Sequence, residues 1–498
     1  MGKVYTTNII NQYSQKANIM WKFIDESLMK FNVCFSRVAA FRWFVTIVVG
    51  LMVCTEHMGV TSIIRALGIN PIFYPSMLHF FRASSWTLES VQRVWVGIVA
   101  ASVQGYKVND MLVLVGDGIK VSKEGRKMPG VKKLHQESGN SAKPEYIHGH
   151  MFGAIGMLIN NGEKFFCNLL SMRIHNGNEV VGKWAGDKYA EESHVVRIVR
   201  EAFGVALQIG KKCILVLDSY YLSEPALSLL AELVLESGNA LLTIVTKAKK
   251  SVVAWEKPSV RKGRGAPQKR GEKIKLWSLF TSETAVFTKV KVSLYGKMQE
   301  VEYLVKDLLW SEGDYFKLRF VLVKWDTSQV ILVCNNVLLT PERIIELYGL
   351  RFKIECSFRA FKQVVAGFAY RFWTSVMPKL NLFAKNDIFR EAVEAVTDKK
   401  MQARIVSAFV ATERFVLIAI IVLGILQMAA LSFGKEIYES AFFWMRTKRD
   451  DTPSEAVTAN FMRKTIFQSF YFSPNLNISR IIQTRLLERS ADDDIPTA

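Results

Sequence analysis

The stretch "KCILVLDSYYLS", residues 212–223, indicates a buried β-strand that ends at a carboxylate, Asp218. A short apolar run closed by a polar turn is typical of such a strand. The stretch "DMLVLVGDG", residues 110–118, has the same form and ends at Asp117. An aspartate in this position either caps a turn or a helix, or lies at the edge of a sheet where functional sites form.

The segments around these two stretches alternate between predicted strands and predicted helices. Strands are expected at "MFGAIGMLI" (151–159), "KFFCNLLSMRI" (164–174) and "NALLTIVTK" (239–247), and helices at 190–210 and about 223–236. Because strands come first and helices enter late, we predict an α/β domain with a mixed sheet and flanking helices.

From about residue 248 to 335 the pattern changes to recurring strands with weak helical periodicity. The strand-like segments are "AVFTKVKVSLY", "QEVEYLVKDLLW", "YFKLRFVLVKW" and "SQVILVCNN". We interpret this part as a β-rich insertion. Near its start the loop "RKGRGAPQKRGEKIK", residues 261–275, carries seven cations and one acid. It is either a solvated surface loop or, as we favour, a contact to a phosphate backbone through Arg264, Lys269 and Arg270.

Helical patterns dominate both ends of the chain. We expect five segments: a helical N-terminal region (1–105), the first part of the α/β core (106–247), the β-rich insertion (248–335), the second part of the core (336–445), and a C-terminal helical region with its tail (446–498). In the first segment, "GVTSIIRALGINPIFYPSMLHFFR", residues 59–82, places two helices on either side of Gly68. That pattern fits a helix-turn-helix that binds DNA ends, and equally an ordinary αα-hairpin.

The 498 residues carry a formal net charge of +20, which indicates a polyanionic partner. The partner is either a nucleic acid or an anionic membrane surface. The apolar stretch "FVLIAIIVLGILQMAAL", residues 415–431, contains Gln427 and is shorter than the roughly 20 residues that a membrane span needs. We therefore predict a buried core helix and no membrane partner; a membrane-associated basic protein is the alternative.

Other sequence features narrow the class of protein further. The six cysteines form no CxxC pair and are scattered through apolar runs, which predicts reduced core thiols in a cytosolic protein. The polar N-terminus predicts no signal peptide. Neither a Walker loop nor GxGxxG occurs, so neither ATP nor NAD is implied. His148 and His150 share one strand face, but without a neighbouring Cys or third His we favour a structural role over a metal site.

The stretch "LYGLRFKIECSFRAFK", residues 347–362, places one carboxylate among cations. At about 100° per residue, a helix gathers four side chains into one narrow strip: Tyr348, Arg351, Glu355 and Lys362. Beside the strip runs an apolar stripe that must pack on a core: Leu347, Leu350, Ile354, Phe358, Phe361 and Val365. One interpretation is that the strip contains only an ordinary i,i+4 ion pair between Arg351 and Glu355 and no functional site.

Two strand-end aspartates and one glutamate on a helix packed against the same sheet favour a metal site. Asp117, Asp218 and Glu355 could together hold two Mg²⁺ ions, whose remaining ligands would be water and phosphate oxygens. Such a pair of ions activates an attacking oxygen and stabilises a leaving oxygen in phosphodiester displacement.

At this point the sequence resembles a known family, the DDE transposases of bacterial insertion sequences, which have an RNase-H-like catalytic core. The resemblance rests on the signature Y-x2-R-x3-E-x6-K, met by Tyr348, Arg351, Glu355 and Lys362, and on two motifs, "VGDGIKVSKEGRKMPGVKKLHQ" and "LVLDSYYLS". It covers roughly residues 106–365. The family also has a β-rich insertion between the second aspartate and the glutamate.

The resemblance implies an RNase-H-like mixed sheet and a set of site residues. Asp117, Asp218 and Glu355 would be catalytic and would hold two Mg²⁺ ions, for which Mn²⁺ could substitute. Tyr348, Arg351 and Lys362 would contact DNA near the cleaved end. A basic groove would be added by the cations that follow the first aspartate: Lys120, Lys123, Arg126, Lys127, Lys132 and Lys133.

The resemblance also implies an activity and partners. The protein would cleave DNA at transposon terminal inverted repeats and transfer the ends into target DNA without ATP, and the family suggests a hairpin step. We expect a homodimer on DNA, because two ends must be brought together, in the bacterial cytoplasm in association with the nucleoid. The alternative is a catalytically inactive or domesticated DNA-binding relic.

Overall fold

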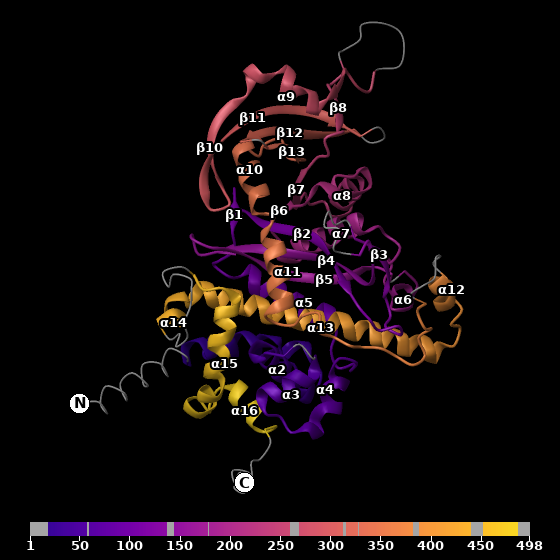
Figure 1. The fold of residues 1–498 in the computed structure, drawn as a ribbon, viewed down its shortest axis with the longest axis vertical. Coiled ribbons are helices and arrows are strands. Elements are labelled where there is room, and N and C mark those ends of the chain that lie inside the picture. Colours follow the sequence, from indigo (N-terminus) through magenta and orange to yellow (C-terminus); the bar gives the residue numbers. More distant parts are fainter. Residues whose placement is uncertain are drawn as a thin grey trace, which may run out of the picture.

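The computed structural model describes residues 18–56, 59–136, 144–177, 179–258, 268–311, 315–326, 328–381, 388–439 and 452–486. Its centre is a large mixed β-sheet, so the protein is of the mixed α/β class that the sequence predicts. Figure 1 shows a β-rich part at one end, the central strands in the middle, and a layer of helices at the other end, with one long helix crossing below the sheet.

Seven strands make the central part of the sheet: β1 (Lys107–Val108), β2 (Met111–Ser122), β3 (Lys132–His135), β4 (Tyr146–Asn160), β5 (Phe165–Asn176), β6 (Cys213–Val216) and β7 (Leu242–Lys247). Strands β2, β4 and β5 pair antiparallel in that order, and β6 and β7 then run parallel to β2 on its other side. The interior of β6 is fully buried, as its apolar sequence predicts.

The segment after β7 is rich in strands, as predicted: β8 (Val253–Trp255), β9 (Lys273–Lys275), β10 (Thr288–Leu294), β11 (Lys297–Trp310), β12 (Phe316–Trp325) and β13 (Ser328–Cys334), with the short helix α9 (Leu279–Ser282). These strands are antiparallel, and β13 pairs with β7. Because of that pairing the strand-rich segment extends the central sheet instead of forming a separate one.

Helices cover the sheet and build the lower layer: α2 (Val38–Val53), α3 (Val60–Leu67), α4 (Tyr74–Phe80), α5 (Leu88–Ala100), α6 (Glu179–Trp184), α7 (His194–Ile209), α8 (Glu224–Ser237), α12 (Ile388–Glu394), α13 (Lys399–Ser432), α14 (Gly434–Glu439), α15 (Glu455–Phe472) and α16 (Asn477–Gln483). Helix α7 starts at Ser193, whose side chain accepts the Val196 N–H, and ends at Gly210 in the left-handed region. Gly68 ends α3 in the same way, where the sequence predicts a break.

Helix α13 is the long apolar helix below the sheet, and it contains the stretch 415–431. It is long and apolar enough to cross a membrane by length and composition, but 94% of its apolar window is buried inside the protein. It packs against β5, α2 and α15. At Gly424 the helix comes so close to Trp95 of α5 that a Cβ has no space. The prediction of a buried core helix is confirmed.

The sequence predicts one continuous helix over 347–365, and this prediction is wrong. The structure has α10 (Pro341–Leu350) and α11 (Lys353–Gln363), separated by a turn at residues 351–352. Helix α10 starts as expected, with Thr340 as N-cap and Pro341 in the first turn. The predicted apolar stripe is still buried across the two helices, since Leu347, Ile354 and Phe361 all lie in the common core.

All six cysteines are free thiols, and five of them are buried as predicted. Cys356 is exposed, so the prediction of a core thiol is wrong there. It follows Glu355 on α11.

Candidate active site

Two neighbouring parallel strands bring the two aspartates together. The register of β2 and β6 pairs Leu112 with Cys213 and Val115 with Val216. The same offset places Asp117 beside Asp218, just beyond the end of β6. Each carboxylate accepts the next backbone N–H: Gly118 N to Asp117 Oδ1 is 2.8 Å, and Ser219 N to Asp218 Oδ1 is 2.7 Å.

The position of Asp117 within its strand differs from the prediction. The sequence places this residue at the end of a strand, but β2 continues through it to Ser122. The reason is the long antiparallel partner β4, whose pairing continues from Asp117 opposite Ala154 to Ser122 opposite Gly149. Asp218 does follow the end of its strand, where it caps a short 3-10 helix.

Helices α10 and α11 deliver the signature residues to these aspartates. The Tyr348 hydroxyl donates to Asp218 Oδ1 at 3.1 Å. The Arg351 guanidinium donates through Nη1 to Asp117 Oδ2 at 3.3 Å and through Nη2 to Glu355 Oε1 at 2.6 Å. Three parts of the chain, around residues 117, 218 and 350, therefore meet in one polar cluster, which we call the acid cluster.

The simple i,i+4 ion pair between Arg351 and Glu355 is present, but it is not the whole arrangement. The same guanidinium also reaches Asp117, from the turn between α10 and α11 to a strand residue 234 positions away. Arg351 keeps only 15% of its side chain exposed, whereas Glu355 keeps 55%. Arg351 is thus a half-buried counter-ion between two acids, and Glu355 lies at the open side of the cluster.

The electrostatics of the acid cluster follow from this crowding. Burial raises the pKa of Asp117 to about 6, and the charges of Asp218 and Glu355 add to the rise. The hydrogen bond from the Gly118 N–H and the charge of Arg351 act in the opposite direction and lower the pKa. Burial acts to lower the pKa of Arg351, but the charges of Asp218 and Asp117 outweigh it and the pKa is raised. Burial also raises the pKa of Tyr348, so its hydroxyl stays protonated and donates a hydrogen bond to Asp218.

The acid cluster has the donor chemistry of a site for a hard divalent cation, since its oxygens come from three carboxylates. Among the described residues, no group of three His, Cys, Asp or Glu side chains is arranged to hold a metal ion as it stands. Arg351 provides the positive charge between Asp117 and Glu355. For the acids to share an ion, the Arg351–Glu355 pair must open, which the exposed side chain of Glu355 permits.

Other cations predicted to contact DNA are placed in several environments. Lys362 is exposed on α11, the same helix as Glu355. Lys269 and Arg270 are exposed, with the Arg270 guanidinium 5.1 Å from the centre of the Trp255 ring. Arg264 lies outside the described residues.

The six cations after Asp117 differ in their exposure and in their partners. Lys123 is drawn inward: its Nζ donates to Phe368 O at 2.5 Å and lies 3.6 Å from the centre of the Tyr370 ring. Burial lowers the pKa of Lys123 to about 7. Three other lysines donate through Nζ to protein oxygens: Lys120 to His135 O, Lys127 to Ser375 O and Lys132 to Asn176 Oδ1. The last two, Arg126 and Lys133, are exposed.

A buried hydrogen-bonded chain behind the acid cluster was not predicted. The Tyr221 hydroxyl lies 2.8 Å from His194 Nε2, His194 Nδ1 lies 2.9 Å from His175 Nδ1, and His175 Nε2 lies 2.8 Å from Glu201 Oε1. A Cβ at Gly118 would come within 2.6 Å of His194 Nε2, so the chain packs directly behind this point of β2. No spacing in the sequence signals it, because its members come from three different elements.

The two histidines of "YIHGHMF" have different environments. His150 is fully buried, with Nδ1 2.7 Å from the Tyr370 hydroxyl and Nε2 2.9 Å from Pro129 O. Burial lowers its pKa to about 3, so the ring is neutral. His148 is half-buried in the same strand. Both ring nitrogens of His150 are satisfied by protein atoms, which fits a structural role.

The chain matches no protein-family model, no curated protein and no solved structure. What can be said of its function therefore depends on the geometry of the acid cluster and on the motifs that form it.

Proposed function

We propose that the protein is a DDE-type transposase that cleaves DNA at the ends of an insertion sequence and joins those ends to target DNA. The observation that carries the proposal is the meeting of Asp117 and Asp218 with Tyr348, Arg351 and Glu355 in one cluster. These residues come from distant parts of the chain, and they are the residues that the transposase signature names.

The topology supports an RNase-H-like catalytic core. An antiparallel unit of β2, β4 and β5 is followed by β6 and β7, both parallel to β2. The first acid lies on β2, the second follows the end of the adjacent strand β6, and the third comes from a helix after the β-rich insertion. We propose that the insertion interrupts the core between the second and third acids.

In this proposal Asp117, Asp218 and Glu355 hold Mg²⁺, or Mn²⁺ in its place. When bound, the metal ions supply activation of the attacking oxygen and stabilisation of the leaving oxygen. Tyr348 fixes the orientation of the Asp218 carboxylate through its hydroxyl. Arg351 balances the acids while no metal is bound and contacts a DNA phosphate once the Glu355 pair opens, for which a guanidinium fork is suited. Lys362 contacts DNA next to it.

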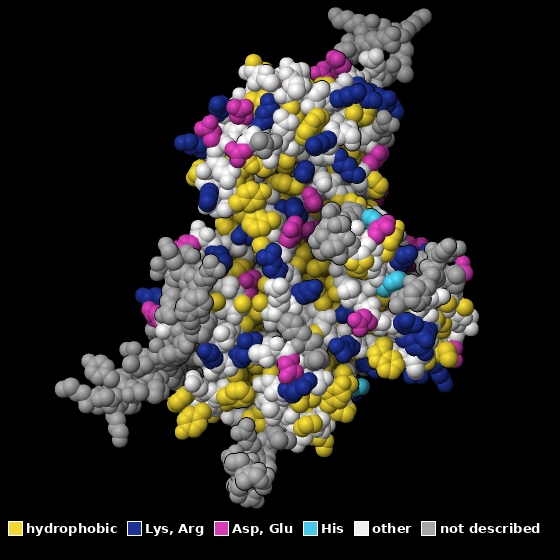
Figure 2. All heavy atoms as spheres, in the orientation of Figure 1, with side chains coloured by type: hydrophobic (Ala, Val, Ile, Leu, Met, Phe, Trp, Pro, Cys, Tyr) yellow, Lys and Arg dark blue, Asp and Glu magenta, His cyan; other side chains and the backbone are white. Residues whose placement is uncertain are grey.

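The partners follow from the same proposal. A net charge of +20 favours a polyanion, and we propose that it is the terminal repeats and the target DNA. Figure 2 shows lysine and arginine side chains spread over the face that carries α10 and α11. The working form would be a homodimer on DNA in the cytoplasm, associated with the nucleoid.

The test is cleavage of DNA that carries the segments flanking the gene, with Mg²⁺ present and absent. Asp117→Ala, Asp218→Ala and Glu355→Ala should each abolish cleavage and leave DNA binding intact. Asp110→Ala, at an exposed acid just before β2, is the matched control and should cleave as wild type does. Retained cleavage in any acid-cluster variant removes that residue from the site.

The Arg351–Glu355 ion pair favours one alternative, an inactive DNA-binding relic, because it fills the space between the acids. The same assay decides between the two. DNA binding without metal-dependent cleavage by the wild-type chain would support the relic.

A further inference from the structure

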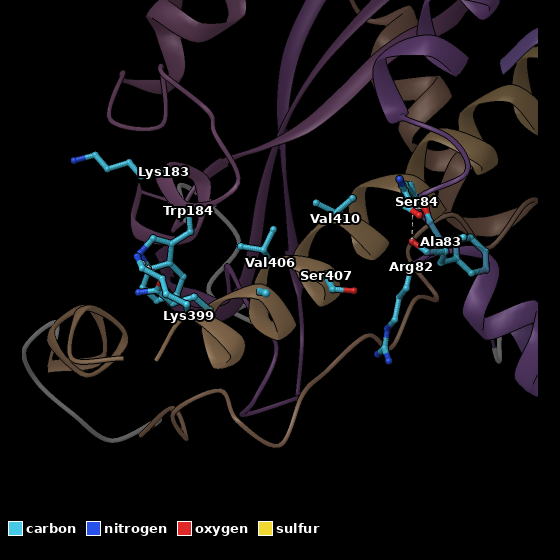
Figure 3. A pocket seen from close by; sticks show the side chains of 13 residues that line it. Arg82, Ala83, Ser84, Lys183, Trp184, Lys399, Val406, Ser407 and Val410 are labelled. Carbon is cyan, nitrogen blue, oxygen red and sulfur yellow. Dashed lines mark hydrogen bonds between the residues drawn. The ribbon is translucent and has the colours of Figure 1, made fainter. Parts of the chain in front are cut away.

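A second polar groove, of about 640 Å³, is lined by none of the residues of the acid cluster. Its walls are the loop between α4 and α5, the end of α6, and one face of α13. Helix α13 contributes residues at helical spacing from Lys399 to Arg414. Figure 3 shows Trp184 and Lys399 on one side, Arg82, Ala83 and Ser84 on the other, and Val406, Ser407 and Val410 between them.

At one end of the groove lies a buried cation without a counter-ion. Arg414 is 7% exposed, and its two Nη atoms donate to the carbonyl oxygens of Phe81, Ala83 and Trp86. Its Nε has no hydrogen-bond partner within the described residues, and none of the carboxylates described there forms an ion pair with it. Glu89 acts on Arg414 at longer range, but Glu89 itself pairs with Arg173.

A cation held in this way is unfavourable unless an anion comes near. The carbonyl oxygens and the Trp86 ring, whose centre lies 4.2 Å from the guanidinium carbon, stabilise the cation but bring no net negative charge, so part of the cost of burying the charge remains. Burial lowers the pKa of Arg414 to about 10, which still leaves it protonated at neutral pH. An anion in the groove would offset that cost.

The rim of the groove adds cations, and its floor is apolar. Arg82 and Lys399 are both exposed, and neither forms an ion pair with a described carboxylate; Lys399 Nζ donates to Gln402 Oε1. Lys183 points away from the groove and pairs with Glu191 at 2.6 Å. The half-buried ring of Trp184 lies beside Lys399, and an indole offers a surface on which a sugar or an unstacked base can pack.

We propose that this groove is a second DNA-binding site, which holds a phosphodiester segment apart from the acid cluster. The proposal rests on the proposed function, because it takes DNA as the partner. Arg82 and Lys399 contact phosphates at the rim, Arg414 adds positive potential from below, and Trp184 packs against a sugar or base. The site reads no sequence; it contributes affinity and fixes the path of the DNA.

The first test measures DNA binding by fluorescence anisotropy in EDTA, where cleavage is not involved. The double variant Arg82→Glu/Lys399→Glu should bind a labelled duplex about tenfold more weakly or worse, and the slope of log K against log salt should fall by about two. The control is Lys211→Glu/Lys212→Glu, the same charge change at two exposed lysines before β6. Binding of the groove variant equal to that of the control overturns the proposal.

The second test uses the unmodified chain, so it does not depend on how the variants fold. Acetylation of Lys399 by an amine-reactive reagent should be slowed several-fold by bound DNA, while Lys211 stays reactive. Equal acetylation of Lys399 with and without bound DNA overturns the groove and leaves the transposase proposal standing. A wild-type chain that binds no DNA at all refutes both.

Discussion

Asp117 should make the metal-free protein less stable, and its removal should therefore stabilise the fold. Its pKa rises from 3.8 to about 6 on folding, mainly because burial disfavours the charged form. The native state therefore binds this proton more tightly than the unfolded chain, and stability falls as the pH rises from below 3.8 to above 6. A shift of about two pKa units corresponds to about 3 kcal/mol.

The perturbation that removes this cost is Asp117→Asn. The amide keeps the shape of the side chain and can still accept the Gly118 N–H. It loses the attraction of Arg351, so we expect a net gain of about 1–3 kcal/mol in the free energy of unfolding at pH 7.5, and little gain at pH 4. The same variant should be unable to cleave DNA.

The assay is urea unfolding in EDTA at both pH values, with Asp110→Asn as the control. Asp110 is exposed and lies seven positions earlier, so its replacement should change little at either pH. A stabilisation by Asp117→Asn that is the same at pH 4 and pH 7.5 would refute the reasoning. So would a loss of stability at pH 7.5.

Two further substitutions test the structure around the acid cluster. Gly118→Ala should destabilise the protein by about 1–3 kcal/mol in thermal unfolding, because its Cβ would meet His194 Nε2 and the Met151 side chain; unchanged stability would contradict the packing behind β2. Tyr348→Phe should cost about 1 kcal/mol in the same assay and slow cleavage by about tenfold through the lost hydrogen bond to Asp218; cleavage at the wild-type rate would contradict an orienting role.

The sequence predicts the strands, the strand-rich character of residues 248–335 and the buried helix well, because each has a local pattern. The short apolar run of β6 favours a fully buried strand, and the seventeen apolar-rich residues 415–431 of α13 favour a buried helix. The spacing of Tyr348, Arg351 and Glu355 predicts that their side chains lie close together, and the structure places all three in the acid cluster. The parallel register of β2 and β6 places the two aspartates beside each other, but the approach of Tyr348 and Arg351 to them is a tertiary contact.

What the sequence could not predict depends on tertiary partners. Strand β2 continues past Asp117 because β4 pairs with the second half of β2, and no residue near Asp117 in the sequence predicts that pairing. The turn between α10 and α11 lies in a stretch whose helical pattern continues across it. The inward course of Lys123 is set by the carbonyl of Phe368, more than two hundred residues away.

The buried chain from Tyr221 to Glu201 belongs to the same category. His175 lies on β5 and His194 begins α7, and only folding brings their Nδ1 atoms to 2.9 Å from each other. Burial lowers the pKa of His194 to about 3, so this ring is neutral, and its partners must be supplied by the protein.

The measurement that tests the central claim most directly is Mn²⁺ binding, followed by electron paramagnetic resonance, in the presence of DNA from the flanks of the gene. The wild-type chain should bind Mn²⁺, and Asp117→Ala, Asp218→Ala and Glu355→Ala should each weaken that binding at least tenfold, while Asp110→Ala should not. Mn²⁺ binding that is unchanged in all three acid-cluster variants would contradict the claim that these carboxylates form a catalytic metal site.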